Sequence, residues 1–148
     1  MLILTGARKS EILNARWEDV DLQRKYVRFP FTKSGKPRTV PLSDSAVGVL
    51  KGLERTGPYV FPNPDTGKPF TSIYRSWFTA REKAGLEDVK LHTLRHSFAS
   101  FLINAGRSIY EVGALLGHSK IETTMRYAHL AEETLKDAVN AVPLGKAA

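Results

Sequence analysis

The sequence predicts one mainly α-helical domain with a small antiparallel β-sheet, an α+β fold covering residues 1–148. Two observations lead to this expectation. Between residues 19 and 42, apolar and polar side chains alternate as they do in strands, and the turn-forming pair Ser34-Gly35 divides the segment into two halves. Through most of the remaining chain, apolar residues recur every three or four positions, which is the period of an amphipathic helix.

The first forty residues predict short helices followed by a hairpin. The stretch from Met1 to Leu4 has the character of the end of a buried helix, which Thr5-Gly6 then interrupts. Residues 8–17 carry apolar side chains on one face, which predicts a short amphipathic helix. The two expected strands are Val27–Phe29 and Arg38–Leu42.

The chain after the hairpin predicts helices separated by glycine- and proline-rich turns. Ser43 is an N-cap residue ahead of an apolar stripe, and Ser108 with Glu111 forms a capping box. A last amphipathic helix follows Tyr127. The expected helices run from Ser43 to Leu53, from Thr71 or Ser72 to Ala84, from His92 to Asn104, from Ser108 to Gly117 and from Ile121 to Tyr127, and the stripe of the last one consists of Leu135, Ala138, Val139 and Val142.

The composition points to a polyanionic partner and excludes several classes. The chain has 22 Lys and Arg against 15 Asp and Glu, a formal net charge of +7 and a pI near 9.8. Such a balance is typical of nucleic-acid binding, although many basic proteins bind none. The absence of cysteine excludes disulfides and thiolate metal sites. No secretory signal is visible, and no apolar run approaches the roughly 20 residues of a membrane helix, so we expect a cytoplasmic protein.

Six polar side chains at predicted helix starts and turns are candidates for chemistry, and each has an ordinary structural explanation when it stands alone. A single arginine, or a lysine beside a hairpin turn, is usually a surface charge. A histidine at a helix end is usually structural, and a tyrosine usually lies in the core or at its rim. The candidates are Arg8, Lys33, His92, Arg95, His118 and Tyr127.

Other enzyme classes have little support in the sequence. His92 and His96 have the four-residue spacing of a helical zinc pair, but the glutamate of a metalloprotease helix is missing and there is no cysteine. No nucleophile elbow is present, and no glycine-rich phosphate loop with its Lys-Ser or Lys-Thr. We therefore expect neither a metal nor another cofactor.

In combination, the six candidates resemble the ordered motifs of the tyrosine recombinases, the phage integrase family. The first arginine motif, the hairpin lysine, the His-x-x-Arg box, the Leu-Gly-His box and the nucleophile segment occur in the family's order. Tyr127 follows His118 by nine residues, which is the family's spacing, whereas Lys36 lies close enough to Lys33 to make the lysine match the weakest. The matching segments are Thr5–Ile12, Thr32–Arg38, His92–His96, Leu116–Ser119 and Thr123–His129.

The resemblance implies a tyrosine recombinase catalytic-domain fold with a site that grips phosphate. A phosphodiester gains negative charge on its nonbridging oxygens as a fifth oxygen approaches the phosphorus. The forked, permanently charged side chains of Arg8 and Arg95 suit those oxygens, with His118 as a third donor. Glu11, one turn from Arg8, is expected to orient its neighbours rather than react.

The resemblance also implies a covalent reaction. Tyr127 would attack the phosphorus, His92 would help to accept its proton, and Lys33 would protonate the departing 5′ oxygen. The resulting 3′-phosphotyrosine keeps the energy of the phosphate bond, so that rejoining requires neither ATP nor metal.

The implied partner is double-stranded DNA, bound by a homotetramer that is joined through the C-terminal helix, in the nucleoid of a bacterial or phage-infected cell. Complete members of the family carry an N-terminal DNA-binding domain and further helices before the first arginine, so we expect this chain to be N-terminally truncated. Two alternatives stay open. One is a type IB topoisomerase, which strand exchange between two duplexes would distinguish. The other is a DNA-binding remnant without catalysis, which a covalent-adduct assay would distinguish.

Overall fold

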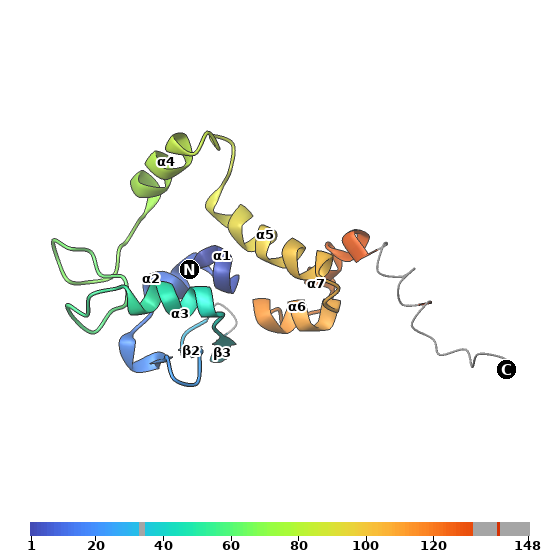
Figure 1. Ribbon diagram of the computed structural model, residues 1–148, viewed down its shortest axis with the longest axis horizontal. Coiled ribbons are helices and arrows are strands. Elements are labelled where there is room, and N and C mark those ends of the chain that lie inside the picture. Colours follow the sequence, from blue (N-terminus) through green and yellow to red (C-terminus); the bar gives the residue numbers. More distant parts are fainter. Residues whose placement is uncertain (33–34, 132–138, 140–148) are drawn as a thin grey trace. The chain divides into compact units, whose positions relative to one another are not determined.

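The computed structural model describes residues 1–32, 35–131 and 139, and the chain divides into two compact units (Figure 1). The first unit comprises residues 1–98 and the second residues 99–148. Helix α5 (Leu91–Asn104) contributes residues to both. Within the described part of the chain, no helix is long and apolar enough to cross a membrane.

The first unit begins with two short helices joined by a tight turn. α1 (Leu2–Thr5) ends where Gly6 adopts a φ of 59°, the left-handed conformation that favours glycine. The Oγ1 atom of buried Thr5 accepts a hydrogen bond from the N–H of Ala7 at 3.2 Å, which fixes the chain beyond the turn. α2 (Lys9–Leu13) follows directly.

The second helix is shorter than the amphipathic helix expected over residues 8–17. It ends at Asn14, whose side-chain amide donates a hydrogen bond to the carbonyl of Ser10 at 2.8 Å. An asparagine that bonds a nearby backbone group in this way competes with helix continuation. Trp17 then opens a 3-10 turn, η1 (Trp17–Asp19).

A three-stranded antiparallel sheet follows, which confirms the predicted small sheet. Its strands are β1 (Val20–Asp21), β2 (Tyr26–Phe29) and β3 (Arg38–Pro41), in the order β1-β2-β3. Val27 pairs with Val40, and both are buried, as the alternating pattern requires.

The link between β2 and β3 is longer than the two-residue turn that Ser34-Gly35 predicts. The last pair of the ladder is Phe29 with Arg38. Continuing this register by one residue would bring Pro30 opposite Pro37. Proline holds φ near about −65°, away from the extended values of a strand, so both prolines disfavour continuing the ladder. Gly35 does have the positive φ, 74°, of a turn residue.

The sheet, α2 and α3 contribute side chains to the core of the first unit. α3 (Asp44–Lys51) begins at the predicted cap, where the Ser43 hydroxyl accepts a hydrogen bond from the N–H of Ala46 at 3.2 Å. α4 (Tyr74–Lys83) lies within the range predicted for the next helix. The core side chains include Ile12, Val27, Phe29, Val40, Val47, Leu50 and Val60.

In the second unit, the structure describes the end of α5, two further helices and a 3-10 turn as far as Ala131. α6 (Ile109–Leu116) has the predicted capping box, in which the Glu111 carboxylate accepts from the Ser108 N–H at 2.8 Å. α7 (Glu122–Met125) covers only part of the helix expected from Ile121 to Tyr127, because the chain turns into η2 (Ala128–Ala131). Of the predicted C-terminal stripe, only Val139 belongs to the described residues, where it is exposed, and the other three members lie outside them.

A buried carboxylate joins the second helix of the first unit to the sheet. The Glu11 side chain is 1% exposed, and Arg38 of β3 donates to its two oxygens from Nη2 at 2.7 Å and from Nε at 3.1 Å. The backbone N–H of Arg8 donates to the same carboxylate at 2.7 Å. Burial acts to raise the pKa of Glu11, but the hydrogen bonds from Arg38 and Arg8 and the charges of both arginines outweigh it and hold that pKa below its ordinary value.

Replacing Glu11 with Gln should lower the free energy of unfolding at neutral pH by about 3 kcal/mol, because the mostly buried Arg38 loses its counter-charge. The contribution of Glu11 is present above the ordinary glutamate pKa and is lost as the pH falls through the lower folded-state value. The difference between parent and variant in urea unfolding should therefore shrink in acid.

The matched control is Asp44→Asn, which removes an exposed ion pair with Lys25 at 2.6 Å. Exposed pairs contribute little, so this variant should unfold close to the parent. A loss in Glu11→Gln no larger than that of Asp44→Asn would mean that the buried carboxylate does not hold helix and sheet together.

Candidate functional site

Arg8 lies at the N-terminal cap of α2, directly after the turn made by Gly6. Its guanidinium contacts Glu11 through Nη1 and Oε1 at 3.1 Å, and its side chain is 24% exposed. The backbone and the side chain of Arg8 are thus held by the same carboxylate, while part of the guanidinium still reaches solvent. The expected orienting role of Glu11 fits this geometry.

Arg95 belongs to the part of α5 that lies in the first unit, and only 6% of its surface is exposed. Its Nη1 donates to the carbonyl of Gly6 at 2.5 Å. A buried guanidinium requires polar partners, and this carbonyl is one of them. Gly6 lies two residues before Arg8. Arg95 is therefore bonded to the turn that precedes Arg8, although 87 positions separate the two arginines in the sequence.

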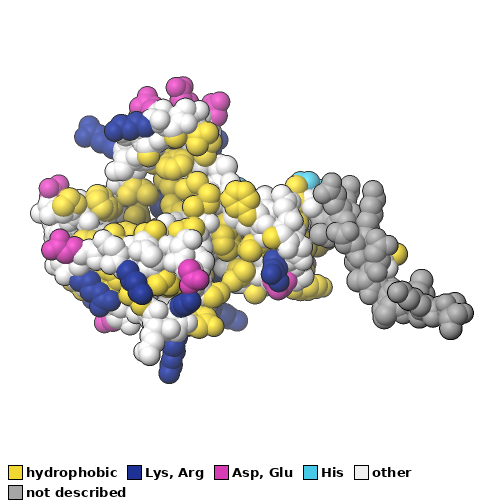
Figure 2. Space-filling model, in the orientation of Figure 1, with side chains coloured by type: hydrophobic (Ala, Val, Ile, Leu, Met, Phe, Trp, Pro, Cys, Tyr) yellow, Lys and Arg dark blue, Asp and Glu magenta, His cyan; other side chains and the backbone are white. Residues whose placement is uncertain are grey.

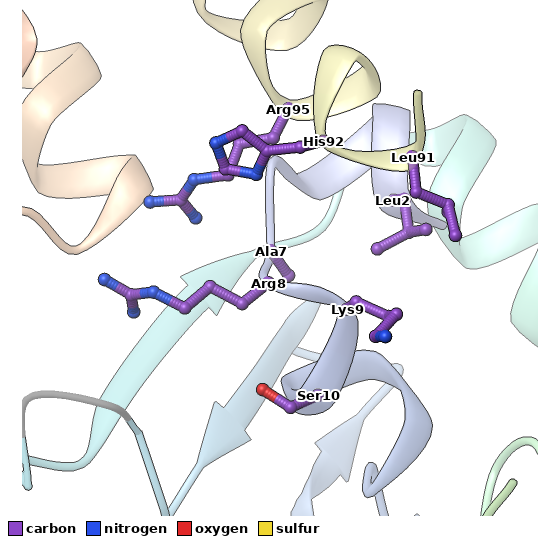
Figure 3. A pocket seen from close by; sticks show the side chains of 8 residues that line it. All are labelled: Leu2, Ala7, Arg8, Lys9, Ser10, Leu91, His92 and Arg95. Atoms are coloured by element: carbon purple, nitrogen blue, oxygen red, sulfur yellow. The ribbon is translucent and has the colours of Figure 1, made fainter. Parts of the chain in front are cut away.

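The two arginines line one pocket in the first unit, with a volume of about 440 Å³. Figure 3 shows the guanidinium groups of Arg8 and Arg95 extending toward the same side of this pocket, with the His92 ring near Arg95. None of the eight lining residues is acidic, so the pocket suits an anion. The lining residues are Leu2, Ala7, Arg8, Lys9, Ser10, Leu91, His92 and Arg95.

His92 lies in the first turn of α5, one turn before His96. The two rings meet edge to face, with centroids 4.7 Å apart. A zinc pair at this spacing would need further ligands. Among the residues that the structure describes, no group of three His, Cys, Asp or Glu side chains could hold a metal ion.

His118 and Tyr127 lie in the second unit. α6 ends at Gly117, whose φ of 66° turns the chain, and the N–H of His118 donates to the carbonyl of Gly113 at 3.0 Å. The Nδ1 atom of His118 lies 2.8 Å from the Oγ1 atom of Thr124. The N–H of Tyr127 donates to the carbonyl of the same threonine at 3.0 Å.

Burial distinguishes Tyr127 from two other tyrosines of the chain. Tyr127 is 6% exposed, whereas Tyr74 and Tyr110 are 65% and 77% exposed. Burial by itself is what a core tyrosine would show, so the case for Tyr127 depends on its neighbours and its motif.

The predicted site residues therefore fall into three groups. Arg8, His92 and Arg95 line one pocket, and His118 and Tyr127 are both bonded to one threonine. Lys33 lies outside the described residues.

Arg38 and Thr124 were not predicted from the sequence. Arg38 lies 27 positions from Glu11, and no local pattern connects the two. Thr124 lies three positions before Tyr127, a helical spacing that could have drawn attention to it.

Comparisons with known proteins identify relatives of this chain. The sequence pattern of the family described as the phage integrase family matches residues 1–134. A tyrosine recombinase of Thermosipho africanus is 36% identical over 143 residues, which cover 94% of this chain and 50% of that protein. The chain spans about half or less of the length of the curated relatives that it matches first.

Solved structures of recombinases are also similar. The catalytic domain of bacteriophage HP1 integrase is 37% identical with a TM-score of 0.72, over 99% of this chain and 81% of that one. The XerH site-specific recombinase, in a pre-cleavage complex with its difH substrate, is 25% identical with a TM-score of 0.75, over 97% of this chain and 45% of that one. The match over residues 1–134, the identities and these folds together show that the chain belongs to the phage integrase family.

Proposed function

We propose that residues 1–148 form a catalytic domain that breaks and rejoins DNA at specific sites by transesterification, with Tyr127 as the nucleophile. The observation that carries this proposal is that two arginines from separate family motifs, Arg8 and Arg95, line one pocket without an acidic residue. The relatives are recombinases and integrases, which favours recombination over the topoisomerase alternative and over a remnant without catalysis.

The pocket of the first unit would stabilise the transition state. Arg8 and Arg95 donate to the nonbridging oxygens of the scissile phosphate, where negative charge increases as the nucleophile approaches. Preorganised donors of this kind typically contribute roughly 3 kcal/mol each to transition-state stabilisation. Glu11 and Gly6 support this role, because they hold the two guanidinium groups before DNA binds.

The covalent step exchanges one bond to phosphorus for another and moves two protons. The phenolic oxygen of Tyr127 bonds to phosphorus while the bond from phosphorus to the 5′ oxygen breaks. His92 takes up the phenolic proton, Lys33 gives a proton to the 5′ oxygen, and His118 donates to a nonbridging oxygen. The products are a 3′-phosphotyrosine and a 5′ hydroxyl, and attack by another 5′ hydroxyl reverses the step.

Double-stranded DNA is the proposed partner. The related recombinase XerH has been solved with its difH substrate, and this chain has a net charge of +7. On the face seen in Figure 2, Lys and Arg side chains are spread among apolar and acidic ones. We further propose that the protein works as a homotetramer on DNA, joined through its C-terminal helix, at the nucleoid of a bacterial or phage-infected cell.

The Tyr127→Phe variant should fold normally but form no covalent DNA adduct, because the substitution removes only the attacking hydroxyl. The assay is incubation with nicked suicide DNA followed by a denaturing gel, and the melting temperature checks the fold. Tyr74→Phe and Tyr110→Phe are the controls and should form the adduct like the parent. An adduct that persists in Tyr127→Phe and maps to another tyrosine would identify a different nucleophile.

Lys33→Ala should cleave ordinary DNA slowly but cleave DNA with sulfur at the bridging 5′ position almost as fast as the parent does. An alkoxide needs a proton to leave, whereas a thiol has a pKa of about 8.5, so a thiolate leaves without one. Arg8→Ala should not be rescued, because the nonbridging oxygens are unchanged. If the sulfur-bridged DNA rescues Lys36→Ala and not Lys33→Ala, the general acid is Lys36. If it rescues neither variant, neither lysine is the general acid.

DNA affinity should fall steeply with salt, on the order of a hundredfold between about 50 and 200 mM, because phosphate contacts release counterions. Removing one phosphate contact, as in Arg8→Ala, should reduce the slope of log K against log salt by about one. Lys51→Ala changes an exposed residue that does not line the pocket and should keep the parent slope. Binding that does not respond to salt would argue against a surface that grips phosphate.

A further inference from the structure

Thr124 connects the two residues proposed to act in the second unit. Its surface is 0% exposed, and its Oγ1 atom lies 2.8 Å from Nδ1 of His118. Its carbonyl accepts the hydrogen bond from the N–H of Tyr127 at 3.0 Å. Thr124 therefore contacts His118 through its side chain and Tyr127 through its backbone.

Gly113 of α6 has no side chain, and the hydroxyl of Thr124 occupies the space that a side chain there would need. A Cβ atom at position 113 would come within 3.0 Å of Oγ1 of Thr124, closer than an ordinary contact allows. The carbonyl of the same glycine accepts the N–H of His118 at 3.0 Å. Gly113 thus holds the backbone of His118 by a hydrogen bond, and its lack of a side chain leaves room for the Thr124 hydroxyl that contacts the His118 ring.

A hydroxyl is a suitable partner for a histidine that must keep one orientation without a fixed charge beside it. It donates to Nδ1 of the neutral ring and accepts from Nδ1–H of the imidazolium, so the contact survives in both protonation states. A carboxylate in the same place would only accept, and it would favour the charged ring. When the hydroxyl donates to Nδ1 of the neutral ring, the ring proton lies on Nε2.

We propose that Thr124 is a positioning residue whose hydroxyl holds neutral His118 in the Nε2–H tautomer, so that Nε2–H donates to the scissile phosphate. The choice of this tautomer is part of the proposal, because a hydroxyl can also accept from an Nδ1–H ring. Its use on phosphate rests on the proposed function.

The test compares the parent with Thr124→Ala, which removes the hydroxyl without crowding Gly113, and with Thr124→Ser, which restores it. Long-range ¹H–¹⁵N spectra of the full chain, at a pH where the ring is neutral, report which ring nitrogen of His118 carries the proton, and His118→Gln assigns the signal. We expect the Nε2–H form in the parent and in Thr124→Ser. In Thr124→Ala we expect a mixture of tautomers.

Single-turnover cleavage of suicide DNA and DNA affinity give the second readout. Loss of one hydrogen bond should slow cleavage by Thr124→Ala roughly five- to tenfold with unchanged affinity, and Thr124→Ser should keep the parent rate. Gly113→Ala, which keeps the hydroxyl but displaces it, should resemble Thr124→Ala.

Three results would overturn the proposal: an Nδ1–H ring in the parent, a parent tautomer in Thr124→Ala, or a cleavage rate in Thr124→Ala equal to that of the parent. If the parent forms no adduct, the proposed function fails, and the spectra still decide whether Thr124 sets the tautomer.

Discussion

Glu11 carries its carboxylate inside the first unit, where Arg38 from the sheet and the backbone and side chain of Arg8 meet it. A charge taken out of water in this way is tolerated only when its partners are in place. Helix α2, strand β3 and the start of the arginine motif must therefore come together as one arrangement. Arg38 binds both oxygens and supplies the main counter-charge, so the three side chains together remain cationic and Arg8 keeps a net attraction for phosphate.

The two units fix their polar residues by different physical means. In the first, a formal charge holds Arg8, and a backbone carbonyl at the Gly6 turn holds Arg95. In the second, a neutral hydroxyl and main-chain groups hold His118 and Tyr127. This difference suits the proposed roles, since arginine never loses its proton, whereas Tyr127 gives up its proton and His118 donates from a neutral ring.

Local sequence signals predicted the fold well wherever the structure depends on neighbours in the chain. The caps at Ser43 and Ser108 and the alternation in the sheet depend on residues a few positions apart, and each is found where it was expected. The predicted helix ends were less accurate. The side chain of Asn14 donates a hydrogen bond to the carbonyl of Ser10, and α2 ends there, earlier than predicted. The prolines that bound the hairpin link likewise limited the ladder more than Ser34-Gly35 did.

The candidate site was predictable in its residue types but not in its supporting contacts. The motifs singled out Arg8, His92 and Arg95, and these line one pocket. The partners that orient the site come from far along the chain, as Arg38 does, or from a side chain of ordinary type, as Thr124 is. Such contacts depend on tertiary packing, and no periodicity in the sequence encodes them.

The small sheet also bears on how the protein avoids self-aggregation. Its two outer strands are β1, with two residues, and β3, with four, and an exposed strand edge is a template for pairing with another molecule. β3 ends at Pro41 and follows Pro37, so both ends of that edge lack an N–H to offer. Edges this short and interrupted offer another copy of the chain little template for stacking into a fibre.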